Sequence, residues 1–120
     1  MSGTKGPAAA VSRLRIAEAR TGAAMLGSQT ELAQWLGVHR SQVTRLLQGH
    51  ELQGEPARRL AALGWVVRAL AQVYEPAVIP DWLLGINAHL GGRRPLDVLR
   101  AGQLGEVIAA VEAARTGSYA

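Results

Sequence analysis

The sequence predicts an all-α protein, and three observations lead to this fold class. Residues that favour helices (Ala, Leu, Arg, Gln and Glu) dominate the 120-residue chain. No run alternates apolar β-branched residues with polar ones, as a half-buried strand would. Several segments instead repeat apolar residues at intervals of three and four, and Gly or Pro separates them. A chain of this length forms one domain or two very small ones.

The N-terminal residues 1–10 are expected to be flexible, and they lack the apolar run of a signal peptide. A first helix should follow from Val11 to about Ala24, with Gly22 weakening its end. The longest apolar run, residues 60–67, is far shorter than the roughly 20 residues of a membrane span. We therefore expect a soluble, cytoplasmic protein.

Two short helices are predicted next. Ser28 is suited to cap a helix over residues 29–36, with Glu31 placed as in a capping box. Gly37 ends this helix, and a second helix runs over residues 40–47.

The spacing of these two helices predicts a helix-turn-helix within residues 11–54. Ala33 is the small residue where the helices cross, and Gly37 supplies the positive φ that the turn needs. Five apolar side chains are expected to fill the wedge between the helices: Leu32, Leu36, Val38, Val43 and Leu46. This motif places its second helix in the major groove of DNA.

The charge distribution favours DNA binding by the same half of the chain. Residues 1–60 carry eight basic and four acidic side chains, whereas residues 61–120 carry five of each. The excess of positive charge is expected if the first half meets a polyanion, although a generally basic surface is the alternative. The candidate DNA contacts lie on the outer face of the second helix: Arg40, Ser41, Gln42, Thr44 and Arg45.

A long linking helix is predicted within residues 55–75, from Pro56 to Tyr74. Apolar residues recur along it at spacings of three and four, which forms a coiled-coil-like seam: Leu60, Leu63, Val67, Leu70 and Tyr74. The other faces are apolar too, so the helix must be buried on several sides. This pattern favours a dimer interface or a bound partner, and the alternative is the central core helix of a monomer.

The C-terminal part, residues 76–120, is predicted to be a compact helical domain. One or two short helical turns should place Trp82 and Leu83 inward. A short helix begins at Pro95 and is closed by Gly102. The last helix carries an apolar stripe at helical spacing: Leu104, Val107, Ile108 and Val111.

The stretch HLGGRRPLDVLRAG, residues 89–102, allows two interpretations. Gly91 and Gly92 with the two following arginines could cradle an anion, although the longer frame of a P-loop is missing. The simpler interpretation is a tight turn between helices, which can present Arg93 and Arg94 to a partner. Arg94 is equally a candidate for a structural brace.

No motif of an enzyme or a metal site is present in the sequence. The three histidines lie too far apart for a local metal motif, and the chain has no cysteine to supply a thiolate. It also lacks a Ser nucleophile elbow and a Gly-rich loop between a strand and a helix. We therefore expect neither catalysis nor a cofactor.

Residues 82–120 contain a run of Gly, Arg and Pro positions that matches a known pattern. The matching residues are Trp82, Leu83, Asn87, Leu90, Gly91, Gly92, Arg93, Arg94, Pro95, Leu96, Asp97, Leu99, Leu104, Glu106, Val107, Gly117 and Tyr119. They closely resemble the C-terminal domain of the MbcA/ParS/Xre antitoxin family. With an Xre-type helix-turn-helix ahead of it, the resemblance covers about residues 11–120.

The resemblance implies an antitoxin of a type II toxin–antitoxin system, encoded beside a RES-domain toxin that degrades NAD. Residues 76–120 would bind this toxin and occlude its NAD pocket. The candidate toxin contacts are Arg93, Arg94, Gly117, Ser118, Tyr119 and Ala120. Residues 55–75 would form a homodimer, and the helix-turn-helix would bind the operon's own promoter as an autorepressor. The alternative is a stand-alone helix-turn-helix transcriptional regulator without a toxin partner.

Overall fold

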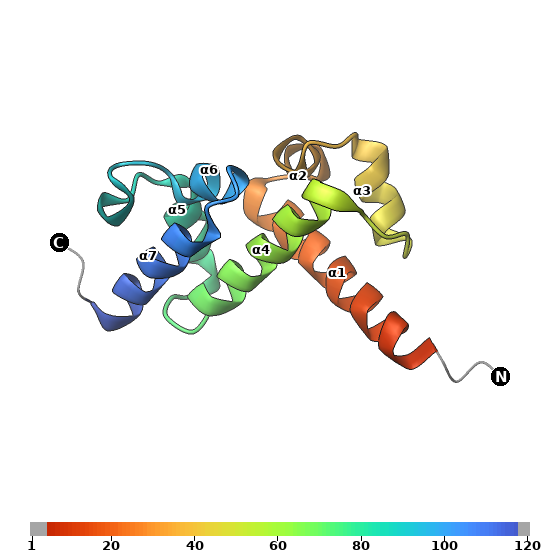
Figure 1. Ribbon diagram of the computed structural model, residues 1–120, viewed down its shortest axis with the longest axis horizontal. Helices are drawn as coiled ribbons and strands as arrows, with labels where there is room; N and C mark the ends of the chain where they lie inside the picture. The colour runs from red at the N-terminus through yellow and green to blue at the C-terminus, as the bar shows by residue number, and fades with distance from the viewer. Residues whose placement is uncertain (1–4, 118–120) are drawn as a thin grey trace. The chain divides into compact units, whose positions relative to one another are not determined.

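The computed structural model describes residues 5–117, with side chains described for residues 13–117. Within this range every regular element is a helix (Figure 1), which confirms the predicted fold class. No helix within residues 5–117 is both long enough and apolar enough to cross a bilayer. The chain divides into two compact units, Met1–Ala61 and Ala62–Ala120, and the division falls inside α4 (Gly54–Leu70).

The first helix, α1 (Lys5–Leu26), is longer at both ends than the sequence predicts. The expected start at Val11 is wrong, since helical structure extends back through most of the segment that was predicted to be flexible. Pro7 lies in the first turn of α1, where a backbone N–H group would have no acceptor within the helix, so proline costs no hydrogen bond there. The alanines that follow Pro7 favour the helix. Gly22 does not end the helix, and it is buried within α1.

Both helices of the predicted helix-turn-helix have the bounds that the sequence predicts. In α2 (Gln29–Leu36), the Ser28 hydroxyl oxygen accepts a hydrogen bond from the backbone N–H of Glu31 at 3.0 Å. Gly37 ends α2 with a φ of +85°, a left-handed conformation that favours glycine. The chain then begins α3 (Arg40–Leu47). Local capping and turn chemistry therefore set the geometry of the motif.

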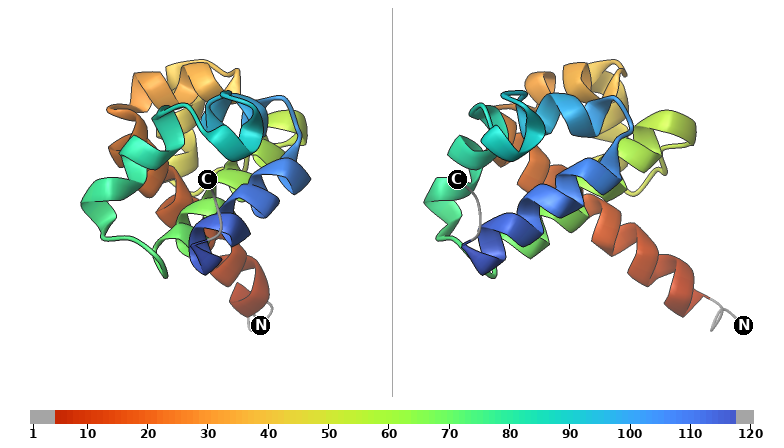
Figure 2. Two further views of the ribbon diagram at one scale, coloured as in Figure 1. Left: turned by 90° about the vertical axis from the view of Figure 1, so that its left-hand side faces the viewer. Right: turned by 60° about the vertical axis from the view of Figure 1, so that its left-hand side comes forward.

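The helices α1, α2 and α3 pack against one another within the first unit (Figure 2). The residues between them are at most 2% exposed: Leu32, Ala33, Leu36, Val43 and Leu46. Val38, also expected in this wedge, is only half-buried. In the same unit, Nη1 of Arg59 donates a hydrogen bond to the carbonyl oxygen of Leu36 at 2.9 Å. This bond satisfies one of the carbonyl groups that the C-terminus of α2 leaves without a helical partner.

The helix α4 ends at Leu70, four residues before the predicted end at Tyr74. Pro76 keeps Glu75 extended, with φ −61° and ψ 148°, so the helix must unwind before it. Tyr74 therefore does not continue the helical seam. The other seam residues are at most 7% exposed within one chain: Leu60, Leu63, Val67 and Leu70. A core helix within a monomer, the alternative given by the sequence, is enough to explain this burial. Dimerisation through these residues stays a prediction.

The second unit contains the end of α4 and several short helices. These are η1 (Pro76–Val78) and η2 (Ala88–Leu90), both 3₁₀ helices, and the α-helices α5 (Ile79–Leu84), α6 (Pro95–Arg100) and α7 (Leu104–Thr116). α5 packs on α6, and both α6 and η2 pack on α7. The residues that fill this unit are at most 2% exposed: Leu83, Leu90, Leu99, Val107 and Val111. Trp82, expected to point inward beside Leu83, is only half-buried.

Replacing Leu36 with alanine should lower the free energy of unfolding by about 2–5 kcal/mol, because the side chain is fully buried and its loss leaves a cavity. Urea denaturation followed by circular dichroism measures the change. Leu14→Ala is the control, since Leu14 is 42% exposed and should cost less than about 1 kcal/mol. Equal losses in the two variants would contradict the placement of Leu36 in the core.

Candidate functional site

The outer face of α3 carries all five candidate DNA contacts, and all five are exposed: Arg40, Ser41, Gln42, Thr44 and Arg45. On the opposite face, Val43 and Leu46 are buried. Neither Arg40 nor Arg45 forms an ion pair with any residue that the structure describes. Their guanidinium groups can therefore bind phosphates or guanine edges without breaking an internal contact.

The first turn of α3 is held by one of these candidate contacts. The side-chain oxygen of Gln42 accepts a hydrogen bond from the backbone N–H of His39 at 3.2 Å. Gln42, at the third position of the helix, thus supplies half of a capping box, and the N-cap residue is His39 instead of a Ser, Thr or Asp. Its side-chain amide nitrogen makes no hydrogen bond with the described residues, and the predicted contact of Gln42 with DNA stays a prediction.

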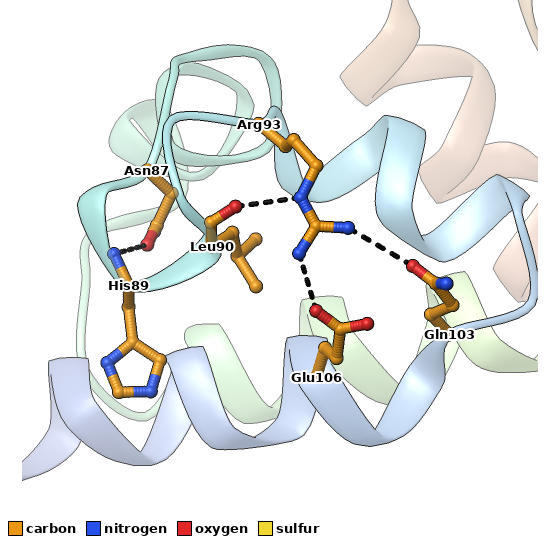
Figure 3. Close-up of polar contacts among 6 residues, drawn as sticks. All are labelled: Asn87, His89, Leu90, Arg93, Gln103 and Glu106. Atoms are coloured by element: carbon orange, nitrogen blue, oxygen red, sulfur yellow. Dashed lines mark hydrogen bonds and ion pairs between the residues drawn. The ribbon is translucent and has the colours of Figure 1, made fainter.

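The loop between α5 and α6 folds into a closed turn (Figure 3), and several of its backbone groups hydrogen-bond to one another. The Asn87 N–H donates to the Arg93 carbonyl at 3.1 Å, and the Asn87 carbonyl accepts from the Gly92 N–H at 2.9 Å. The Gly91 N–H donates to the Ala88 carbonyl at 3.1 Å. An anion cradle needs such N–H groups free to point at the ligand. The tight-turn interpretation is therefore confirmed, and the anion-cradle interpretation is wrong.

The side chain of Arg93 ties this loop to the start of α7 (Figure 3). Its Nε donates to the Leu90 carbonyl at 2.8 Å, and Nη1 donates to the Gln103 side chain at 3.2 Å. Its Nη2 lies 2.5 Å from Oε1 of Glu106. A planar guanidinium carries its donors on three separate nitrogens in a fixed fork, so it can bind three acceptors that lie in different directions. Arg93, and not Arg94 as the sequence suggested, is the structural brace.

Arg94 remains available to a partner. Its side chain is exposed and makes no hydrogen bond or ion pair with the residues that the structure describes. It lies at the edge of a hollow of about 340 Å³, which we call the Arg94 hollow. This hollow is also lined by Ile86, Asp97 and Gln103. The predicted pair of arginines therefore separates into one that shapes the loop and one that can contact another molecule.

The C-terminal candidates fall mostly beyond the part of the chain that can be described. Gly117 ends α7 with a φ of +69°, and it is exposed. Ser118, Tyr119 and Ala120 lie outside the described residues. Among residues 13–117, no group of three or more His, Asp or Glu side chains is arranged to hold a metal ion.

Ile86 is a surface feature that the sequence analysis missed. Its side chain is 79% exposed, and it lines both the Arg94 hollow and a second hollow of about 310 Å³. The second hollow, which we call the Trp82 hollow, also includes Tyr74, Trp82 and His89. No sequence signal identifies this exposure, because Leu83, Ile86 and Leu90 recur at helical spacing, which predicts burial.

Arg93→Ala should lower the free energy of unfolding by about 1–2 kcal/mol, because it removes the three hydrogen bonds of the guanidinium group. The bond to Glu106 contributes little to this loss, since that ion pair is exposed to solvent. Urea denaturation measures this loss, and faster amide exchange at Asn87 should accompany it. The matched control is Arg94→Ala, which removes the same charge without breaking a described contact and should cost less than about 0.5 kcal/mol. A larger loss for Arg94→Ala would contradict the assigned brace.

No protein family and no curated protein matches the sequence. One chain in the crystal structure of the M. tuberculosis MbcT–MbcA toxin–antitoxin complex has a similar fold, with a TM-score of 0.71 and 25% sequence identity. The alignment covers 88% of this chain and 96% of that chain, so it includes residues from both units. The chain thus has the fold of a component of a toxin–antitoxin complex.

Proposed function

We propose that this chain is the antitoxin of a type II toxin–antitoxin system and that it neutralises a RES-domain toxin that degrades NAD. The observation that carries the proposal is the similarity to a chain of a toxin–antitoxin complex over nearly the full length of both chains. The resemblance of residues 82–120 to the MbcA/ParS/Xre antitoxin family supports the choice of a RES-domain partner.

The mechanism is steric occlusion of the toxin's NAD pocket, without chemistry by the antitoxin. The toxin contacts are placed in the second unit, where Arg94 offers an exposed guanidinium for a carboxylate of the partner. Arg93 acts indirectly in this scheme, because its side chain holds the loop from which Arg94 projects. Gly117, Ser118, Tyr119 and Ala120 complete the proposed contact set.

Co-expression with the RES-domain protein encoded beside this chain should restore growth that the toxin alone arrests. In vitro, NAD consumption by the purified toxin should fall in proportion to added antitoxin and stop near a fixed molar ratio, because occlusion is stoichiometric. A toxin inactivated in its NAD pocket serves as the control for growth. Unabated NAD consumption in the presence of excess antitoxin, with no complex on gel filtration, would contradict the proposal.

We infer in addition that the helix-turn-helix binds the operon's own promoter and represses it. The exposed polar face of α3 and the excess of basic residues in the first half of the chain support this role. A homodimer forms part of the inference, because two recognition helices about one DNA turn apart read paired half-sites. Sedimentation equilibrium of the purified chain tests the dimer directly.

Gln42→Ala and Arg45→Ala should each weaken promoter binding by about 1–3 kcal/mol if the side chains make bidentate contacts to bases. Mobility-shift titration at low salt measures the change, and circular dichroism checks that α3 survives the loss of the Gln42 cap. Arg58→Ala is the matched control, since it removes one exposed positive charge from α4 instead of α3. Equal weakening by Arg45→Ala and Arg58→Ala would favour a generally basic surface.

A stand-alone transcriptional regulator is the second candidate function. The exposed polar face of α3 favours this second function, because a helix that binds DNA through that face needs no toxin partner. The two candidates differ in one observation: a regulator binds its promoter and leaves the neighbouring toxin's NAD consumption unchanged.

A further inference from the structure

We propose that Ile86 is the central apolar contact of this chain with its toxin, with Arg94 as the charged contact beside it. The proposal rests on the proposed antitoxin function and names the surface that carries it. Ile86 is 79% exposed, more than any other large apolar side chain in the described part of the protein. Leu84, two positions earlier, is 44% exposed.

Exposure of a single apolar side chain is common on protein surfaces, so the surroundings of Ile86 carry the argument. The backbone on both sides of it is held in place. A Cβ atom on Gly85 would lie 2.9 Å from the carbonyl oxygen of Asp81, so only glycine fits there. Asn87 is bound to the Arg93 carbonyl, and Arg93 is bound to α7. Ile86 is therefore presented by a rigid turn, which lowers the entropic cost of binding.

The surface around Ile86 has the shape of a docking site. Ile86 lines the Arg94 hollow on one side and the Trp82 hollow on the other, and the two measure about 340 Å³ and 310 Å³. A partner that receives the Ile86 side chain in an apolar socket can place its own side chains in both hollows. Interfaces concentrate binding energy in such central anchors, which are surrounded by contacts that exclude water.

The charges define the chemistry of the occupant. Arg94 forms no hydrogen bond or ion pair with the described residues, including Asp97 of the same hollow, so its guanidinium can pair with a carboxylate of the partner. The occupant is thus a protein surface with an apolar socket next to an acidic side chain. Under the proposed function we assign this surface to the toxin, since the similar chain occurs in a toxin–antitoxin complex.

Isothermal titration of the purified neighbouring RES-domain protein with the full-length chain tests the proposal. Ile86→Ser should raise the Kd about tenfold or more, and Arg94→Glu should raise it by a similar factor. Ile86→Leu should retain most of the affinity, because it keeps the apolar volume. Val78→Ser and Arg20→Glu are the matched controls: Val78 is 41% exposed but lines neither hollow, and Arg20 is an exposed arginine of the first unit.

The outcomes separate this inference from the proposed function. If the wild-type chain binds the toxin and Ile86→Ser binds equally well, the Ile86 surface is wrong while the antitoxin function stands. If the wild-type chain does not bind, both are wrong. If Ile86→Ser changes the oligomeric state but not the Kd for the toxin, a second copy covers Ile86 and the inference is overturned. Circular dichroism melts confirm that the exposed substitutions leave the fold intact.

Discussion

Burial of apolar faces between very short helices is the interaction on which this structure depends. α2 and α3 have eight residues each, and α5 and α6 have six. Helices shorter than about 12 residues are marginal in water, so they form because a neighbour covers their apolar side. Leu36 and Val43 are fully buried in the first unit, and Leu83 and Leu99 are 1% exposed in the second. Each short helix is therefore stable only as part of its unit.

This packing leaves the opposite faces of the same helices free to bind. On α3, burial of Val43 and Leu46 fixes which polar side chains point outward. In the second unit, the Arg93 guanidinium adds to the apolar packing of Leu90, because the two glycines that follow Leu90 have no side chains to bury. The three bonds of Arg93 hold the turn, and they leave Arg94 and Ile86 exposed at its edge.

The two proposed activities both use rigid surfaces instead of reactive groups. A recognition helix and a braced turn are ordered before binding, so little conformational entropy is lost when a partner arrives. An antitoxin that acts by occlusion needs affinity and a suitable shape, and it needs no general base, nucleophile or metal ion. Placing the DNA face and the toxin surface in different units would let one chain serve both partners.

The sequence by itself determined the features that local chemistry controls. The bounds of α2 and α3 were predicted correctly, because the Ser28 cap and the left-handed turn at Gly37 act within a few residues. Only the tertiary structure decided the rest. The brace at Arg93 depends on Glu106, 13 residues away, and no spacing rule identifies such a pair. The exposure of Ile86 likewise depends on which side chains the other elements cover in the folded chain, and the sequence alone does not show this.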